Sequence, residues 1–267
     1  MSVSPDGAGE LTDCVAIVTG AGRGIGAAIA TELAHRGAAV ALADIDAAAV
    51  TTLADHLRAS GGPAEPFEVD VASETSVQGL VSTCLARFGR IDLVVNNAAI
   101  IHADPLIDLP AAVFSQVMQV NLVGPFNVMR AVARAMAEQS VSPESGRRGL
   151  IINIGSAAAD IARPFLAAYG ASKAGLNHLS RSAAVAFAEL QIGVTVLYPA
   201  LTVRSGTWTQ VAQQLADAEG LTAAELEATR EFGDAQTVAD NVVWIAATPG
   251  LELTGQLVEG PDRVRPI

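Results

Sequence analysis

Tyr169 and Lys173 stand four residues apart in the segment YGASK, at the start of a stretch with helical spacing. Residues at positions i and i+4 share one face of a helix, so the phenol and the ammonium lie near each other. A free tyrosine titrates at about 10, and a neighbouring positive charge lowers that pKa because it favours the phenolate. The pair therefore predicts an acid–base group that exchanges a proton with a substrate oxygen. By itself such a pair is more often a half-buried aromatic ring beside a lysine.

Ser156 adds a third polar group to this pair. It lies 13 positions before Tyr169, at the end of an apolar stretch that predicts a strand. A hydroxyl at that place can orient or polarise a substrate oxygen while the phenol transfers the proton.

A glycine-rich stretch, TGAGRGIG at residues 19–26, lies between a predicted strand and a predicted helix. Glycines allow positive φ angles and a close approach of the backbone, and a helix N-terminus attracts a pyrophosphate. The sequence therefore predicts a dinucleotide site at this turn. Its predicted cofactor-binding residues are Gly20, Gly22, Arg23, Gly24, Ile25 and Gly26. A glycine-rich turn without a ligand is the alternative.

Asp44 ends the next predicted strand and lies 20 residues beyond Gly24. A carboxylate there can accept both ribose hydroxyls of NAD and repels a 2′-phosphate. Arg23 opposes this argument, since a cation in the turn can face a phosphate. One well-placed carboxylate favours NAD as the cofactor, with NADP as the less favoured one.

Strands and helices alternate along the chain, which predicts an α/β fold with a doubly wound parallel sheet and helices on both faces. The predicted strands lie at 14–20, 39–45, 66–71, 91–98, 150–156, 194–200 and 254–260. The predicted helices lie at 24–37, 47–60, 73–89, 167–190 and 237–247. Residues 110–139 form either one long helix or two that break near Gly124 and Pro125.

The chain has 267 residues and no internal repeat or linker, so it predicts a single catalytic domain at 13–267 after a flexible leader at 1–12. A helical excursion within about 201–232 is expected to cover a substrate pocket.

The formal net charge is −12, which disfavours nucleic-acid binding and attraction to anionic membranes. The N-terminus lacks the pattern of a signal peptide, so a cytoplasmic location is expected. Four scattered histidines and two distant cysteines predict no metal site.

Several motifs in order resemble the short-chain dehydrogenase/reductase family, from about residue 13 to 260. TGAGRGIG is similar to that family's glycine-rich turn, and NNAA at 96–99 to its NNAG segment. YGASK is similar to its YxxxK motif, with Ser156 at the expected distance and Asn121 in VNLVG.

The resemblance implies roles for particular residues. Tyr169 would transfer the proton, Lys173 would support it and bind the nicotinamide ribose, and Ser156 would orient the substrate oxygen. Asn121 would help to hold a water chain. The resemblance also implies that Asp70 and Val71 flank the adenine, and that Asn97 and Ala98 line the middle of the cofactor. It further implies a homotetramer or homodimer packed through 110–139 and 167–190.

The segment after the sixth predicted strand departs from the family pattern. The family usually has Pro-Gly there and a threonine five positions beyond the proline, which contacts the carboxamide of nicotinamide. Here Pro199 is followed by Ala200, and Arg204 stands at the threonine position. Thr202 and Ser205 are the candidates for the missing contact, and Arg204 can meet an anionic substrate group or a surface carboxylate.

The expected activity is NAD-dependent interconversion of a secondary alcohol and a ketone, on a small molecule, with Tyr169 as the acid–base. A reductase for 3-oxoacyl or polyketide substrates that uses NADPH is the alternative. A nucleotide-sensing protein with this fold and no turnover is a third possibility, against which the complete Ser, Tyr and Lys set argues.

Overall fold

The computed structural model describes residues 11–199, 202–203, 206–229 and 232–267. Its strands are β1 (Val15–Thr19), β2 (Ala39–Asp44), β3 (Ala64–Glu68), β4 (Leu93–Asn96), β5 (Gly149–Ile154), β6 (Ile192–Leu197), β9 (Gln256–Gly260) and β10 (Arg263–Pro266). They form one sheet in the order β10-β9-β6-β5-β4-β1-β2-β3. All neighbours pair in parallel except β9 and β10, which are antiparallel. The predicted α/β Rossmann-type fold is therefore confirmed, with a largely parallel sheet.

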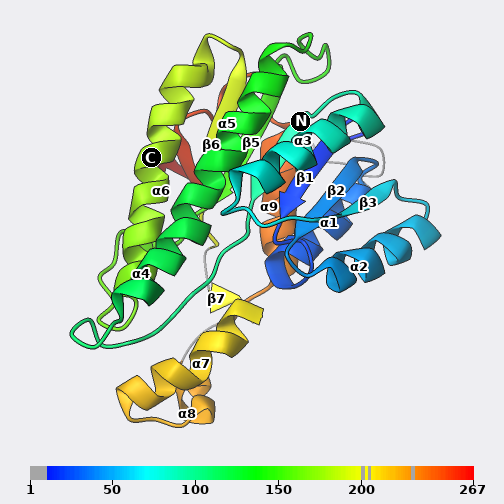
Figure 1. Cartoon of the computed structure of the whole chain (residues 1–267). Coiled ribbons are helices and arrows are strands. Elements are labelled where there is room, and N and C mark those ends of the chain that lie inside the picture. Colours follow the sequence, from blue (N-terminus) through cyan, green and yellow to red (C-terminus); the bar gives the residue numbers. More distant parts are fainter. Residues whose placement is uncertain (1–10, 200–201, 204–205, 230–231) are drawn as a thin grey trace.

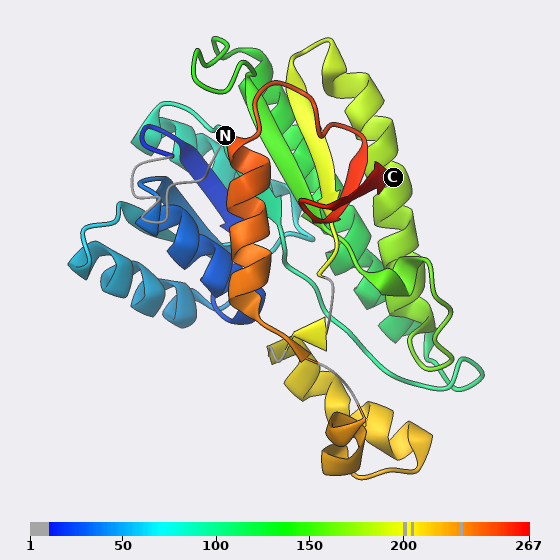
Figure 2. The same cartoon turned by 180° about the vertical axis from the view of Figure 1, so that it is seen from behind.

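Helices cover both faces of this sheet (Figures 1 and 2). The helices are α1 (Gly24–His35), α2 (Ala47–Ala59), α3 (Glu74–Phe88), α4 (Ala111–Met118), α5 (Gly124–Ala137), α6 (Ala167–Ala188), α7 (Gly206–Glu219), α8 (Ala223–Ala228) and α9 (Ala235–Ala247). One buried cluster joins the sheet to α1, α2 and α9, and a second joins it to α3, α5 and α6. The sheet is thus buried on both sides, which explains why its strands are apolar at successive positions.

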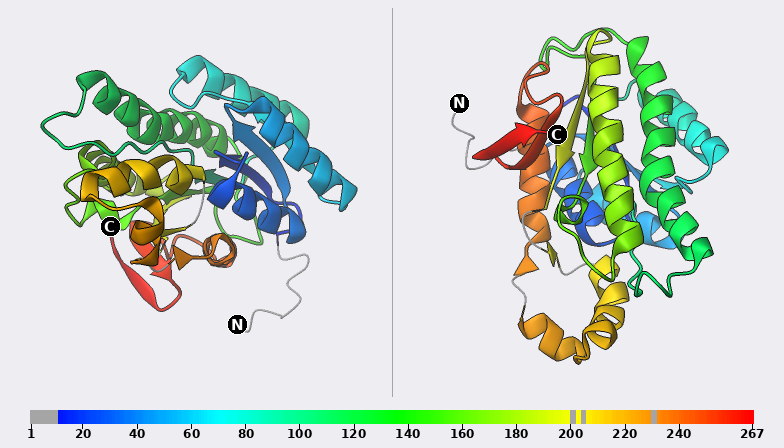
Figure 3. Two further views of the ribbon diagram at one scale, coloured as in Figure 1. Left: turned by 90° about the horizontal axis from the view of Figure 1, so that it is seen from below. Right: turned by 90° about the vertical axis from the view of Figure 1, so that its left-hand side faces the viewer.

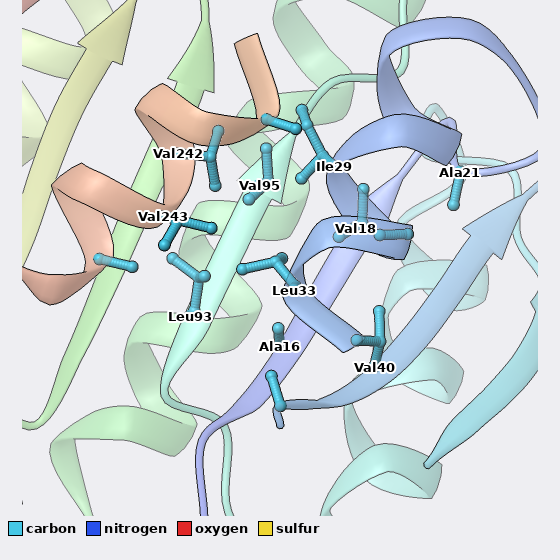
Figure 4. Packing of buried hydrophobic residues seen from close by; sticks show 14 of the residues in the cluster. Ala16, Val18, Ala21, Ile29, Leu33, Val40, Leu93, Val95, Val242 and Val243 are labelled. Atoms are coloured by element: carbon cyan, nitrogen blue, oxygen red, sulfur yellow. The ribbon is translucent and has the colours of Figure 1, made fainter. Parts of the chain in front are cut away.

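The side chains of β1 show how one strand serves both clusters. Ala16 and Val18 belong to the cluster under α1 and α9, whereas Val15 and Ile17 belong to the opposite one. Successive side chains of a strand point to opposite faces, so an unbroken apolar run fills both layers. Figure 4 shows Val18 packed near Ile29 of α1 on the first face.

Two predicted strand regions differ from the structure. The strand predicted at 66–71 is β3 at Ala64–Glu68, and Val69 to Val71 lie beyond its end. Val69 and Val71 are nevertheless buried, and it is this burial that gives the segment its strand-like pattern. At the C-terminus β10 was not predicted; its four residues are all exposed, so they carry no apolar pattern.

The region 110–139 contains two α-helices that are interrupted directly before Gly124 and Pro125, as the second of the two predicted alternatives has it. Between α4 and α5 the chain makes a π-helical turn at Gln119–Val123. Pro125 lies in the first turn of α5, where a missing backbone N–H is tolerated. The interruption between the two helices therefore ends where the glycine and the proline begin.

Leu11, which falls within the leader predicted at 1–12, belongs to the folded core. Its side chain is buried, and its N–H donates to the Arg36 carbonyl at 3.0 Å. Residues 1–10 of the predicted leader lie outside the described residues.

The predicted excursion contains α7, α8 and a small sheet of β7 (Thr202–Val203) and β8 (Phe232–Gly233). Trp208 and Phe232 stack edge to face with ring centroids 5.1 Å apart. Figures 1 and 3 show α7 and α8 beyond the carboxyl ends of the parallel strands. Across the described part of the chain, no helix combines the length and the apolar character needed to span a bilayer.

Candidate active site

The predicted site residues gather where the parallel strands end. The strand order reverses between β1 and β4, which are neighbours in the sheet although they are not consecutive. In open α/β sheets, ligands bind outside the carboxyl ends of the strands at such a reversal. The turn after β1, Asp44 at the end of β2 and Asn97 after β4 all lie on this edge.

The glycine-rich turn is closed by the close approach of two backbone segments. Gly20 and Gly24 adopt φ angles of +65° and +57°, a region that other residues rarely enter. A Cβ atom at Gly26 would lie 2.0 Å from the Gly20 carbonyl oxygen, so no other residue fits there. Because the backbone N–H groups at the start of α1 have no partner within the helix, the turn fits the phosphates of a dinucleotide.

Replacement of Gly26 by alanine tests this packing. We expect Gly26→Ala to lower the free energy of unfolding by about 1–3 kcal/mol, because the added methyl group meets backbone atoms that cannot move aside. It should also lower the affinity for NADH at least about tenfold, since the phosphate-binding turn must open. Thermal unfolding with and without NADH measures both effects.

Gly79→Ala is the matched control for this prediction. Gly79 lies in α3, is exposed, and has nothing within 4 Å of a Cβ atom. Alanine should therefore leave NADH binding unchanged and stabilise the helix by up to about 1 kcal/mol. Equal behaviour of the two variants would contradict the proposed role of Gly26.

Asp44 is joined to the glycine-rich turn. Its Oδ2 accepts a hydrogen bond from the Gly22 N–H at 2.9 Å, and its Oδ1 accepts one from the Asp46 N–H at 3.1 Å. A Cβ atom at Gly22 would lie 3.0 Å from the same carboxylate. The turn and the carboxylate therefore form one surface. Arg23 is the N-cap residue of α1 and is exposed beside it.

Thr19 and Asn97 connect β1 with β4 at the edge of the sheet. The Asn97 amide nitrogen donates to the Thr19 and Gly20 carbonyl oxygens at 3.0 and 3.1 Å. The Thr19 hydroxyl accepts from the backbone N–H groups of Asn97 and Ala98. The Asn97 side chain thus fixes the glycine-rich turn in place. Polar groups that are already used in these hydrogen bonds are not available to bind a cofactor. The prediction missed Thr19, whose signal was a hydroxyl at the last position of an apolar strand.

Asp70 and Val71 follow β3, as the predicted adenine-flanking residues. Asp70 is exposed and its Oδ1 accepts from the Ala72 N–H at 2.9 Å. Val71 is buried and its carbonyl oxygen accepts from the Asn127 amide of α5 at 3.1 Å. The structure therefore places Val71 against α5 and leaves the Asp70 carboxylate at the surface.

Ser156, Tyr169 and Lys173 are brought together by β5 and α6. Ser156 follows β5 by two residues, and its hydroxyl accepts from the Ala158 N–H at 3.2 Å. Lys173 is 3% exposed, and its Nζ donates to the Ile154 carbonyl oxygen at 2.8 Å. The same Nζ lies 5.7 Å from the centroid of the Tyr169 ring. A hydrogen bond joins the side chains of Tyr169 and Ser156.

The protonation behaviour of this pair differs from the prediction. Burial raises the pKa of the Tyr169 phenol, and the hydrogen bond with Ser156 opposes that rise. Burial also lowers the pKa of the Lys173 ammonium to about 8. The expectation that the ammonium dominates the phenol is therefore wrong for the protein alone, because desolvation of the phenol is the larger influence.

Asn121 lies in the π-helical turn and is fully buried. Its Oδ1 accepts from the Ile100 N–H at 2.9 Å, and its Nδ2 donates to the Ile100 carbonyl at 2.8 Å. The Nδ2 also donates to the Ser172 hydroxyl, which donates to the Tyr169 carbonyl at 2.7 Å. Asn121 thus ties the segment after β4 to the helix that carries Tyr169. Ser172 was not predicted, although its place between Tyr169 and Lys173 was visible.

The segment after β6 is described only in part. Pro199 follows β6 and is half-buried, and Thr202 is the first residue of β7. Ala200, Arg204 and Ser205, on which the departure from the family pattern depends, lie outside the described residues.

Comparisons with known proteins agree with this geometry. A family model described as short chain dehydrogenase matches residues 14–216. The chain is 35% identical over 219 residues to a galactitol 2-dehydrogenase of Agrobacterium fabrum, covering 82% of each chain. It resembles a crystal structure of NAD⁺-bound xylitol dehydrogenase with a TM-score of 0.80 and 31% identity, over 88% of this chain and 93% of that one. A metagenomic short-chain oxidoreductase in complex with NADP gives a TM-score of 0.74 and 30% identity, over 94% and 97% of the two chains.

The family model covers most of the chain, and the reported relative and structures match it over 82% to 97% of their own length. The chain is therefore an NAD(P)-dependent oxidoreductase that belongs to the short-chain dehydrogenase/reductase family.

Proposed function

We propose that this protein is an NAD-dependent dehydrogenase that interconverts a secondary hydroxyl group of a small polyol and the corresponding ketone. The observation that carries the proposal is the group of Ser156, Tyr169 and Lys173 at the carboxyl edge of the sheet. The substrate class comes from relatives whose names contain galactitol and xylitol.

Tyr169 would move the proton in this reaction. A bound nicotinamide cofactor would supply the acceptor for the hydride of the alcohol carbon. The phenolate oxygen of Tyr169 takes the proton from the substrate hydroxyl, and the Ser156 hydroxyl donates to the same substrate oxygen. Since only the ionised phenol accepts a proton, the rate of alcohol oxidation should rise as the pH rises above neutrality.

Lys173 and Asn121 would support this transfer. With a pKa of about 8, the Lys173 ammonium is mostly charged at neutral pH and close enough to stabilise the phenolate as it forms. Asn121 fixes the N-terminal part of α6 through Ser172. We propose that it acts by positioning this helix and by holding water next to Lys173.

Asp44 supports NAD over NADP in the proposed function. Its carboxylate reaches the backbone of the phosphate-binding turn, where a 2′-phosphate would meet a negative charge. The exposed Arg23 and the NADP-bound relative favour the second candidate, an NADPH-dependent ketoreductase for 3-oxoacyl or polyketide substrates.

Asp44→Ala should change cofactor choice without loss of turnover. We expect the ratio of kcat/KM for NAD⁺ to that for NADP⁺ to fall at least about tenfold, because the repulsion of a 2′-phosphate is removed. Steady-state kinetics with each cofactor measures this ratio. Asp46→Ala is the control, since that side chain caps α2 at Ala49 and should affect stability more than cofactor choice. An unchanged ratio in Asp44→Ala would contradict the NAD assignment.

The experiment that tests the function is a substrate panel assayed by NADH absorbance. Sugar alcohols, simple secondary alcohols, hydroxy acids and steroid alcohols are each offered with NAD⁺ and with NADP⁺. We expect the highest kcat/KM with a sugar alcohol and NAD⁺. Preferred reduction of a 3-oxoacyl thioester with NADPH would instead favour the second candidate.

Residues outside the proton-transfer group would shape the substrate site. The small core of the excursion around Trp208 packs against Ile101 and against Phe165 and Leu166, the latter the N-cap residue of α6. We therefore propose that the excursion covers the substrate as part of the same domain.

The homodimer or homotetramer remains a prediction. Phe126 of α5 and Val185 of α6 are exposed, 41% and 77%, and fit such an interface.

A further inference from the structure

Tyr198 occupies a place beside the segment that carries Ser156. It follows β6 directly and is 3% exposed. A Cβ atom at Gly155 would lie 2.4 Å from the Tyr198 ring, so the ring packs flush against the backbone just before Ser156. The Gly155 N–H donates to the Leu197 carbonyl at 2.8 Å, which fixes the two segments side by side.

The hydroxyl group of Tyr198 reaches α6. The Asn177 side chain donates to it through Nδ2. Asn177 lies one helical turn beyond Lys173, so both side chains share a face of α6. Asn177 is 7% exposed, and its Oδ1 has no hydrogen-bond partner within the described parts of the chain.

The same hydroxyl also reaches the turn that follows Ser156. Asp160 ends the short 3-10 turn Ala157–Ala159. Burial is the main cause that raises the pKa of the Tyr198 phenol, and the nearby Asp160 carboxylate raises it further. Arg265 of β10 donates to Asp160 at 2.7 Å, and its guanidinium lies 5.9 Å from the Tyr198 ring centroid. Arg265 also lies 4.0 Å from Glu259.

These contacts connect two segments that must keep a fixed relation for the proposed reaction. Ser156 lies on the 155–160 segment, while Tyr169 and Lys173 lie on α6. The Tyr198 hydroxyl contacts both, through Asp160 and Asn177. We propose that Tyr198 is a positioning residue that sets the Ser156 hydroxyl against the Tyr169 phenol, and that Arg265 extends this connection to the C-terminal strand. The inference rests on the proposed function of the Ser156–Tyr169–Lys173 group.

Tyr198→Phe tests the role of the hydroxyl, because it keeps the ring on Gly155. A displaced Ser156 should lower kcat for the preferred alcohol by about tenfold to a hundredfold, while the Kd for NADH stays unchanged. Asn177→Leu removes the hydrogen bond to the Tyr198 hydroxyl by changing its donor on α6. It also removes the unpaired Oδ1, so its Tm should not fall although its kcat does. A lower kcat without a lower Tm separates positioning from a structural role.

A titration provides a readout that needs no turnover. Tyr169 and Tyr198 are the only two tyrosines in the sequence, so Tyr198→Phe leaves Tyr169 as the single phenol. Its ionisation is followed by the near-ultraviolet absorbance of the phenolate. The wild-type titration curve of Tyr169, needed for comparison, is obtained by subtracting the absorbance curve of Tyr169→Phe from that of the wild type. Since the Ser156 hydrogen bond lowers the Tyr169 pKa, its weakening in Tyr198→Phe should raise that pKa.

Arg265→Ala and Arg263→Ala form the matched pair for the C-terminal strand. Both residues lie in β10, but Arg263 pairs only with Glu259 in the described structure and is largely exposed. We expect a loss of kcat of a few fold in Arg265→Ala and none in Arg263→Ala. Wild-type values of kcat and of the Tyr169 pKa in Tyr198→Phe would overturn the proposal. A wild-type enzyme that oxidises no alcohol would refute the proposed function instead, and the titration would still test the positioning.

Discussion

Tyr169→Phe is expected to lower kcat for alcohol oxidation by about 10²–10⁴-fold, because it removes the group that we propose takes the substrate proton. The Kd for NADH should change little, since we propose that the glycine-rich turn and Asp44 make most of the cofactor contacts. The pH dependence should change as well. The wild-type rate rises with pH as the phenol ionises, and the residual rate of the variant should lose that rise. Initial-rate measurements across the pH range give the change in kcat and the change in its pH dependence.

Two comparisons make the Tyr169→Phe result specific. The Tm of the variant should stay close to that of the wild type, because the ring remains and only the hydroxyl is lost. Ser156→Ala should lower kcat by a smaller factor, since the phenol stays in place and only its partner is removed. Wild-type kcat in Tyr169→Phe would contradict the assigned role of the phenol.

Lys173→Met is expected to abolish most activity and to stabilise the protein at neutral pH. Burial lowers the Lys173 pKa from 10.5 to about 8, which corresponds to about 3 kcal/mol against the buried charge. The variant loses the bond to the Ile154 carbonyl, at a cost of about 1–2 kcal/mol. The net gain in the free energy of unfolding should be about 1–2 kcal/mol, measured by denaturant unfolding near pH 7.

The sign of this effect gives a pH test. Below about pH 8, Lys173 carries a proton in both the folded and the unfolded chain, so the full burial cost applies. Between about 8 and 10.5 the folded chain binds fewer protons, and the wild-type free energy of unfolding should rise with pH. Lys173→Met should lack this rise.

Lys173 is also the only lysine in the sequence, since the other fifteen basic residues are arginines. Selective isotope labelling of lysine therefore gives one side-chain NMR signal, whose titration reports the Lys173 pKa directly. A value near 10.5, or a variant less stable than the wild type at neutral pH, would contradict the prediction.

The order of the elements and the identity of the main motifs could be read from the sequence because both are local. Apolar runs and helical spacing are patterns within short stretches of sequence. The glycines of the turn after β1 and the interval between Tyr169 and Lys173 are local in the same way. One strand whose end differs from the prediction and one strand that was not predicted show the limit of such patterns. Val69 and Val71 are buried apolar residues although they lie beyond the end of β3, and β10 has only one large apolar side chain, Val264, which is exposed at the edge of the sheet.

Only the tertiary structure determines which residues that are distant in the sequence contact each other, because local sequence patterns carry no information on such contacts. Asn121 and Ser172 are 51 residues apart and meet through a π-helical turn, and Thr19 meets Asn97 across 78 residues. The balance of charge and burial at Tyr169 also depends on atoms from several elements, so spacing alone gave the wrong dominant influence on its pKa. The sequence thus determined the fold class, the family and the residue types of the site. Only packing gives the hydrogen-bond partners of these residues, their protonation and the positioning role proposed for Tyr198. The reason is that desolvation and long-range contacts depend on the whole folded chain.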